Sequence, residues 1–161
     1  MRRSHHREDP GLDVSVPAIV LKMVPDRYGH GRLGVIRSLG RLGVPVYALH
    51  ESRHIPAARS RFSREDIPWP IGEHPDAGTL GTLVELGARI GGAPLLIATD
   101  DVGALFVEDH ADELRRWFRF PALPLGLVRR CADKYLLHDL CVEHGVPTPA
   151  VVVPDRRADL T

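Results

Sequence analysis

Short apolar runs alternate with segments of helical period, and this alternation constrains the fold more than any other feature of the chain. The first run, "AIVLKMV" at 18–24, is nearly continuous, as expected of a strand buried on both faces of a parallel sheet. Leucine and isoleucine then recur at helical spacing over 31–42, Gly43 and Pro45 end that helix, and "VPVYALH" at 44–50 is a second strand. This β-loop-α-β unit has the length of one right-handed crossover.

The alternation continues through the next seventy residues. A short extended piece, "IPWP", precedes an amphipathic helix over 79–90, which ends at the "GG" of 91–92. "APLLIAT" at 93–99 is a third strand, and a further helical region follows over 102–118. Strands that alternate with helices of this length predict an α/β fold, with a Rossmann-like parallel sheet flanked by helices.

The last forty residues differ in character. A connector with two prolines, "FPALPLG", leads to a helix predicted over 129–145, with Asp133 as its N-cap and Gly145 as its C′ residue. A strand-like run, "AVVV" at 150–153, closes the pattern with nothing after it to pair with. The sequence therefore predicts an incomplete α+β segment after the first domain.

Composition and charge limit the compartment and the partners. The formal net charge is zero, whereas a nucleic-acid or anionic-membrane partner usually goes with a basic excess, so neither partner is expected. The polar N-terminus has no signal-peptide pattern, and no apolar run approaches the ~20 residues of a membrane span. Cys131 and Cys141 fall in the predicted 129–145 helix, roughly 15 Å apart and too far for a disulfide. These features predict a cytoplasmic protein.

The heptapeptide "YGHGRLG" at 28–34 places Gly29, Gly31 and Gly34 in a G-x-G-x-x-G array between the first strand and the first helix. A dinucleotide site needs such a turn tight against the strand, and an acidic residue about 20 positions on. Glu51 stands at that distance, but "PDRY" lengthens the loop before the first glycine. Two interpretations stay open: a dinucleotide-binding turn, or a strand-to-helix turn in which glycine gives backbone freedom and close packing.

The glycine array and the "TDD" at 99–101 both follow predicted strands, and ligands of open α/β sheets bind at that edge. Backbone N–H groups at Gly29 and Gly31 are candidates to bind a substrate carboxylate or phosphate. Asp100 and Asp101 are candidates to bind a substrate amine, with helix N-capping as the alternative for either.

Other groups of residues give weaker evidence of a functional site. His50 and His54 have the spacing of zinc ligands on a helix, but they fall at a strand end and in a loop, so no metal site is predicted. No side chains are arranged as a nucleophile and its base, so no catalytic residue is assigned. Four arginines form a basic loop that is expected to be solvated, with an acidic or phosphorylated ligand as the alternative: Arg53, Arg59, Arg61 and Arg64.

The segments "VIRSLGRLGVPVYAL", "PLLIATDD" and "ADKYLLHDLCVEHGVPTPAVVV" together resemble the start of the ATP-grasp superfamily, and most closely its carboxylate–amine ligases of the carbamoyl-phosphate-synthase-like type. The resemblance covers most of residues 17–153, and its most specific part is "DK…L…C…HGVPTP". It implies a Rossmann-like pre-ATP-grasp domain over 17–123 and the first elements of an ATP-grasp domain over 124–161. The polar composition of the N-terminus separately predicts a disordered tail over 1–16.

The resemblance also implies a reaction. Family members phosphorylate a carboxylate with ATP and Mg²⁺, and an amine or related nucleophile then displaces phosphate from the acyl phosphate. In relatives the lysine of the "DK" element contacts ATP phosphates, and here it is Lys134. An ammonium on a flexible stem can offset phosphate charge; the alternative is a solvated lysine on a surface helix.

The chain departs from the family at its end. The second ATP-binding lysine, the adenine-hinge strand and the magnesium ligands lie beyond the point that corresponds to Thr161, so the chain alone is expected not to catalyse ligation. A truncated gene product is preferred to a split subunit or a stand-alone module, and a homodimer stays open. The rival functions are a Rossmann-like nucleotide- or metabolite-binding module and an NAD-dependent oxidoreductase fragment.

Overall fold

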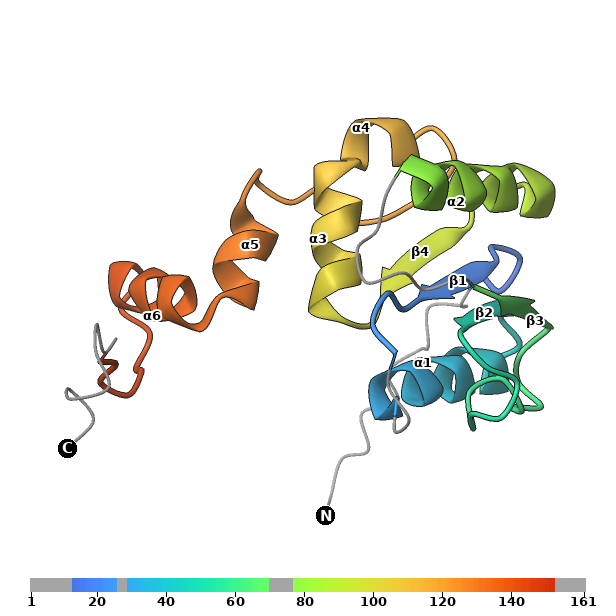
Figure 1. The fold of residues 1–161 in the computed structure, drawn as a ribbon, viewed down its shortest axis with the longest axis horizontal. Helices are drawn as coiled ribbons and strands as arrows, with labels where there is room; N and C mark the ends of the chain where they lie inside the picture. The colour runs from blue at the N-terminus through green and yellow to red at the C-terminus, as the bar shows by residue number, and fades with distance from the viewer. Residues whose placement is uncertain (1–12, 26–28, 70–76, 153–161) are drawn as a thin grey trace, which may run out of the picture.

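A computed structural model describes residues 13–25, 29–69 and 77–152, and these form an α/β body with a helical arm (Figure 1). The body holds one sheet of four parallel strands in the order β3-β2-β1-β4. The strands are β1 (Ala18–Leu21), β2 (Val46–His50), β3 (Glu65–Pro68) and β4 (Leu95–Ala98). The helices are α1 (His30–Arg41), α2 (Ala77–Ile90), α3 (Asp101–Asp109), α4 (Ala111–Leu114), α5 (Leu127–Ala132) and α6 (Lys134–Glu143).

Helices cover both faces of the sheet, which explains why the apolar runs of the strands are continuous. All four residues of β1 are fully buried. Ala18 and Val20 pack with Ile36 of α1 on one face, whereas Ile19 and Leu21 pack toward α2, α3 and α4 on the other. Figure 1 shows α1 below the sheet and α2 above it. The predicted parallel sheet with flanking helices is confirmed.

The strand order reverses direction between β1 and β4. The chain runs outward from β1 to β2 and β3, and then returns to place β4 on the other side of β1, with Ala18 opposite both Val46 and Leu95. In an open α/β sheet this switch point leaves a crevice at the carboxyl ends of the two strands. The residues that follow β1 and β4 are therefore the expected ligand-binding positions of this fold.

Helix ends follow the predicted turn chemistry. Gly43 after α1 and Gly145 after α6 both have left-handed backbone angles, with φ of 89° and 65°. Asp133 caps α6, because its side chain accepts hydrogen bonds from the backbone N–H groups of Tyr135 and Leu136, each at 2.9 Å. Both C′ glycines and this N-cap are confirmed.

Two predictions in the C-terminal part are wrong. The helix expected over 129–145 is two helices, since Asp133 has extended backbone angles (φ −86°, ψ 122°) that end α5 and begin α6. Cys131 and Cys141 therefore lie in different helices, and both are free thiols. The run at 150–152 pairs with no strand among the described residues, because no strand edge lies beside it.

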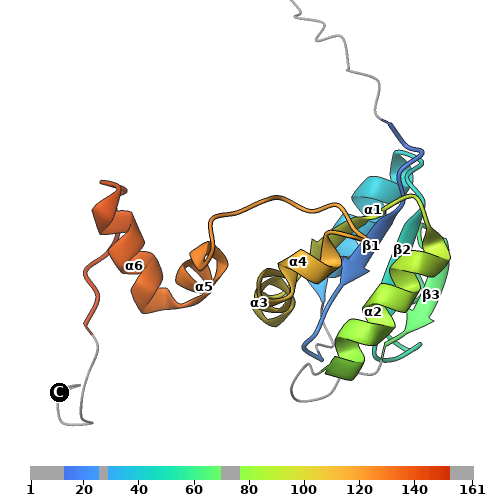
Figure 2. The ribbon, with the colours of Figure 1, turned by 90° about the horizontal axis from the view of Figure 1, so that it is seen from above.

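Helices α5 and α6, called here the arm, extend away from the body (Figures 1 and 2). The backbone N–H of Val128 donates to Glu108 Oε1 at 3.1 Å, and Arg129 lies 3.3 Å from Asp109, so α5 is attached to α3. None of the residues described in the arm is buried. No helix within the described ranges is long and apolar enough to cross a membrane. Residues 1–12 of the predicted tail lie outside the described residues. Residues 26–28, just before the first glycine of the array, and Pro70 of the predicted "IPWP" piece also lie outside them.

Candidate binding site at the carboxyl edge of the sheet

The structure brings four of the five predicted site residues to one edge of the sheet. Gly29 and Gly31 open the helix that follows β1, and Asp100 and Asp101 come directly after β4. Since β1 and β4 are neighbours, these residues flank the switch point, where ligands of such sheets bind.

Asp100 is the anchor of this edge. Its Oδ2 accepts from the backbone N–H groups of Met23 at 2.9 Å and Val24 at 2.8 Å, and its Oδ1 accepts from Gly103 N at 2.8 Å. Lys22 Nζ lies 3.6 Å from the same carboxylate. The N-cap alternative is confirmed for Asp100, and its carboxylate also ties the end of β1 to α3. A substrate amine would have to compete with these partners.

Asp101 has the more accessible carboxylate of the pair. It is exposed in the first turn of α3 and lines a cavity of about 240 Å³ between α3 and α5, together with Leu127, Val128 and Cys131. Of the two predicted amine ligands, Asp101 is the one whose position suits a ligand between the body and the arm.

The first turn of α1 is open on the same edge. Gly29 is its N-cap, and among the described residues no side chain caps this helix and no acidic side chain occupies its first turn. A Cβ at Gly31 would meet nothing within 4 Å, so close packing does not require glycine there. The N-terminal end of a helix attracts anions, because backbone N–H groups and the helix dipole point at it.

Arg32, inside the glycine array, is a residue of this edge that sequence reasoning missed. It is buried and donates from Nη1 to the carbonyl of Leu49 at 3.1 Å and to Glu51 Oε2 at 2.9 Å. The glutamate that a dinucleotide ribose would need is therefore already bound by Arg32. The available signal was the helical spacing that puts Arg32 on the same inward face as Ile36.

Lys134 does not join this cluster. It is exposed at the first position of α6, and α5 lies between α6 and the body in Figure 1. A phosphate bound by Lys134 would therefore sit beside the arm and not in the crevice between β1 and β4.

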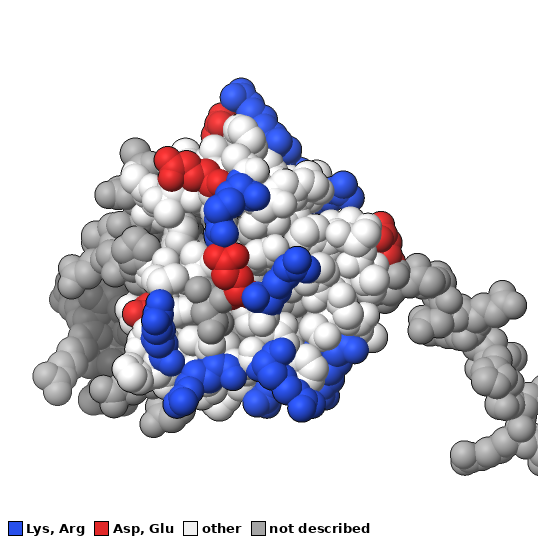
Figure 3. Space-filling view, turned by 90° about the vertical axis from the view of Figure 1, so that its right-hand side faces the viewer, with Lys and Arg blue, Asp and Glu red and all other residues white. Residues whose placement is uncertain are grey.

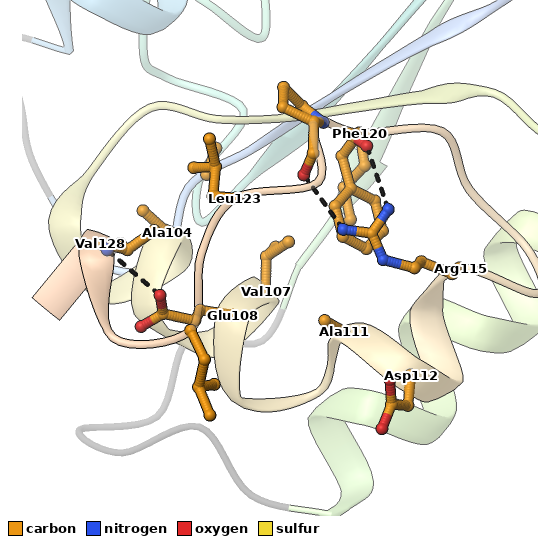
Figure 4. Close-up of a pocket in the computed structure, with 13 residues that line it drawn as sticks. Ala104, Val107, Glu108, Ala111, Asp112, Arg115, Phe120, Leu123 and Val128 are labelled. Atoms are coloured by element: carbon orange, nitrogen blue, oxygen red, sulfur yellow. Dashed lines mark hydrogen bonds between the residues drawn. The ribbon is translucent and has the colours of Figure 1, made fainter.

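A cavity of about 480 Å³ contains none of the predicted site residues. It lies beside the outer edge of β4, between α3, α4 and the segment that leads to the arm (Figure 4). Its walls are mostly apolar, and the polar side chains at its rim are Glu108, Asp112 and Arg115. Arg115 donates to the carbonyls of Phe120 and Pro121 and stacks on the Phe120 ring at 4.5 Å.

The predicted basic loop joins α1 in one basic surface. Arg41 of α1 and Arg61 of the loop both lie over the Phe62 ring, 5.7 and 4.9 Å from its centroid. Basic side chains gather along the lower edge of the face drawn in Figure 3. His50 is buried and His54 is exposed, and the described residues include no group of three or more side chains placed to hold a metal ion.

Comparison of the chain with protein-family models, with curated proteins and with solved structures finds no match.

Proposed function

We propose that this chain belongs to an ATP-dependent carboxylate–amine ligase that works through an acyl phosphate, with the α/β body on the substrate side and the arm on the nucleotide side. The observation that carries the proposal is Lys134. It is exposed at the first position of a helix that Asp133 caps, on an arm that is separate from the sheet. This agrees with the role that the resemblance gives to the "DK" element.

In the proposed reaction a carboxylate oxygen of the substrate attacks the γ-phosphorus of ATP, and ADP leaves. The amine then attacks the carbonyl carbon of the acyl phosphate, inorganic phosphate leaves with the carbon–oxygen bonding electrons, and the amine loses a proton. Lys134 offsets phosphate charge in the first step, for which the arm has to bring the ATP phosphates to the carboxylate bound at the body. The described residues include no group of three or more side chains placed to hold a metal ion, and no step assigned to this chain depends on Mg²⁺.

The carboxyl edge supplies the second half of the proposal. The open N-terminal turn of α1, with Gly29 and Gly31, attracts a carboxylate, and Asp101 attracts a protonated amine. Asp100 keeps its anchoring role, since its oxygens already hold Met23, Val24 and Gly103.

The experiment is a calorimetric titration of the purified chain with ATP and Mg²⁺. We expect Lys134→Gln to weaken ATP binding at least tenfold, equivalent to about 1.4 kcal/mol. Arg116→Gln, which removes an exposed cation outside the proposed sites, serves as the matched control and leaves the affinity unchanged. Equal affinities for the wild-type chain and Lys134→Gln would refute the role of Lys134.

A Rossmann-like nucleotide- or metabolite-binding module is the second candidate, because the open turn of α1 lies at the switch point of the sheet. Titration with NAD and NADP distinguishes it from the ligase. Gly31→Val is the informative variant, since a Cβ at Gly31 has no described neighbour within 4 Å and so clashes with none. Tight NAD binding that this variant abolishes would favour the dinucleotide interpretation over the ligase.

A further inference from the structure

Among the described residues, the outer edge of β4 is only partly paired. The N–H groups of Leu95 and Thr99 donate to the carbonyls of Pro17 and Leu21, at 2.8 and 3.0 Å, on the β1 side. Because the direction of backbone bonding alternates along a strand, the N–H and C=O groups of Leu96 and Ala98 point the other way, to the outer edge.

One residue begins a fourth ladder there, and the ladder then stops. Arg119 accepts from Leu96 N at 3.0 Å and donates to the carbonyl of Pro94 at 2.9 Å. The next residue in register is Pro121, which has no N–H for the carbonyl of Leu96. Its own carbonyl, which would accept from Ala98 N, instead accepts from Arg115 at 3.1 Å (Figure 4).

The unused edge faces the 480 Å³ cavity, because Leu96 and Ala98 both line it. A backbone acceptor at Leu96 and a backbone donor at Ala98 therefore lie beside apolar walls. An extended strand provides both matching backbone groups and apolar side chains for the cavity, which is how sheet edges accept peptides.

The chain contains a segment of the matching kind at 150–152. Val151 and Val152 are β-branched, 42% and 80% exposed, and in no ladder. In Figures 1 and 2 residues 146–152 lie next to α6, which α5 and α3 separate from β4, so they cannot reach the β4 edge of their own copy as the arm stands. None of the described residues of the arm is buried, and the large apolar side chains of Tyr135 and Val142 are also exposed there.

We propose that residues 150–152 of a second copy add as a strand to the open edge of β4, and that the exchange is reciprocal, so that two copies form a two-fold dimer through their arms. The dimer saturates the backbone groups of Leu96 and Ala98 and covers the exposed valines. This inference does not depend on the proposed function, since it uses neither ATP nor Lys134.

Sedimentation velocity over a range of concentrations tests the proposal on the whole chain. We expect the wild-type chain to dimerise, and Ala98→Pro and Val151→Asp each to raise the dimer dissociation constant at least tenfold. Ala98→Pro removes only an outward-pointing donor, and proline is tolerated at such edge positions. Leu42→Asp, a similar change at an exposed residue at the end of α1, should leave the dimer unchanged.

Mixing the two variants gives the sharpest readout. Each variant lacks one half of the exchange, so an equal mixture of Ala98→Pro and Val151→Asp chains should form heterodimers that neither forms alone. If Ala98→Pro unfolds, as circular dichroism would show, hydrogen exchange of the Ala98 amide in the wild-type dimer replaces it, with protection expected. A monomeric wild-type chain, a dimer that tolerates Val151→Asp, or an unprotected Ala98 amide would overturn the proposal.

Discussion

Arg32 and Glu51 form an ion pair that joins the first turn of α1 to the end of β2, with Nη1 of the arginine 2.9 Å from Oε2 of the glutamate. The arginine side chain is 1% exposed and the glutamate 17%, so water screens this pair little. The guanidinium also lies against Gly29, where a Cβ would stand 3.3 Å from Nη2. The glycine array therefore accommodates an internal cation.

We expect Glu51→Gln to lower the free energy of unfolding by about 2–3 kcal/mol, because it leaves the buried guanidinium without a counter-charge. Urea denaturation measures the change. Glu65→Gln is the control: it removes an ion pair whose Glu65 and Arg89 side chains are 43% and 53% exposed, so it should cost less than about 1 kcal/mol. Equal effects of the two substitutions would contradict a structural role for the Arg32–Glu51 pair.

Asp100→Ala should lower the free energy of unfolding by about 2–4 kcal/mol, since it removes an N-cap and two further charged hydrogen bonds. Asp101→Ala, one position along and exposed, should change it by less than about 0.5 kcal/mol. Thermal or urea unfolding of both variants makes the comparison. A cost at Asp101 as large as that at Asp100 would show that the anchor has been misassigned.

Substitution of two glycines in α1 by alanine should change the free energy of unfolding in opposite directions. A Cβ at Gly34 would meet nothing within 4 Å, so Gly34→Ala should raise the free energy of unfolding by about 0.5–1 kcal/mol through helix propensity. A Cβ at Gly40 would stand 2.7 Å from the backbone oxygen of Phe62, so Gly40→Ala should lower it. Stabilisation by both changes would mean that α1 does not pack against the 62 region.

Glu143 should titrate below the usual range for glutamate, because a hydrogen bond from Arg130 and the charge of Arg130 lower the pKa of its carboxyl group. A lowered pKa means that folding favours the ionised form. The contribution of this pair to stability is therefore complete above the ordinary glutamate pKa and is lost as the pH falls through the lowered value.

An NMR titration of the Glu143 carboxyl carbon measures this pKa. Arg130→Gln should return the midpoint to the ordinary glutamate value, whereas Arg129→Gln, which removes the neighbouring pair with Asp109, should leave it low. An unchanged midpoint in Arg130→Gln would place the cause elsewhere.

The sheet and its flanking helices could be predicted because their signals are local. The continuous apolar residues of β1 are enough to predict a strand buried on both faces. Gly43 and Gly145 mark helix ends without reference to the rest of the fold. The carboxyl-edge position of Asp100 followed from the same pattern, since the residue after a parallel strand must lie there.

The remaining features depend on distant contacts. The bond of Arg32 to Glu51 exists only because β2 lies beside β1, and the cavity at β4 forms only where α3, α4 and the segment that leads to the arm meet β4. The break at Asp133 was missed for another reason. The apolar spacing continues across it, and periodicity outweighed the capping signal that the same residue carried.

The anchor at Asp100 has a consequence for how the protein is made. The Met23 amide hydrogen-bonds to the Asp100 carboxylate, which is synthesised 77 residues later. At roughly 5–20 residues per second, translation of the intervening residues takes about 4–15 s. During this time β1 emerges from the ribosome without β4, its backbone open along one side and its apolar residues uncovered. The nascent chain is therefore most exposed to misassociation before "TDD" has been synthesised, and the body can close only after that tripeptide and the helices that follow it are made.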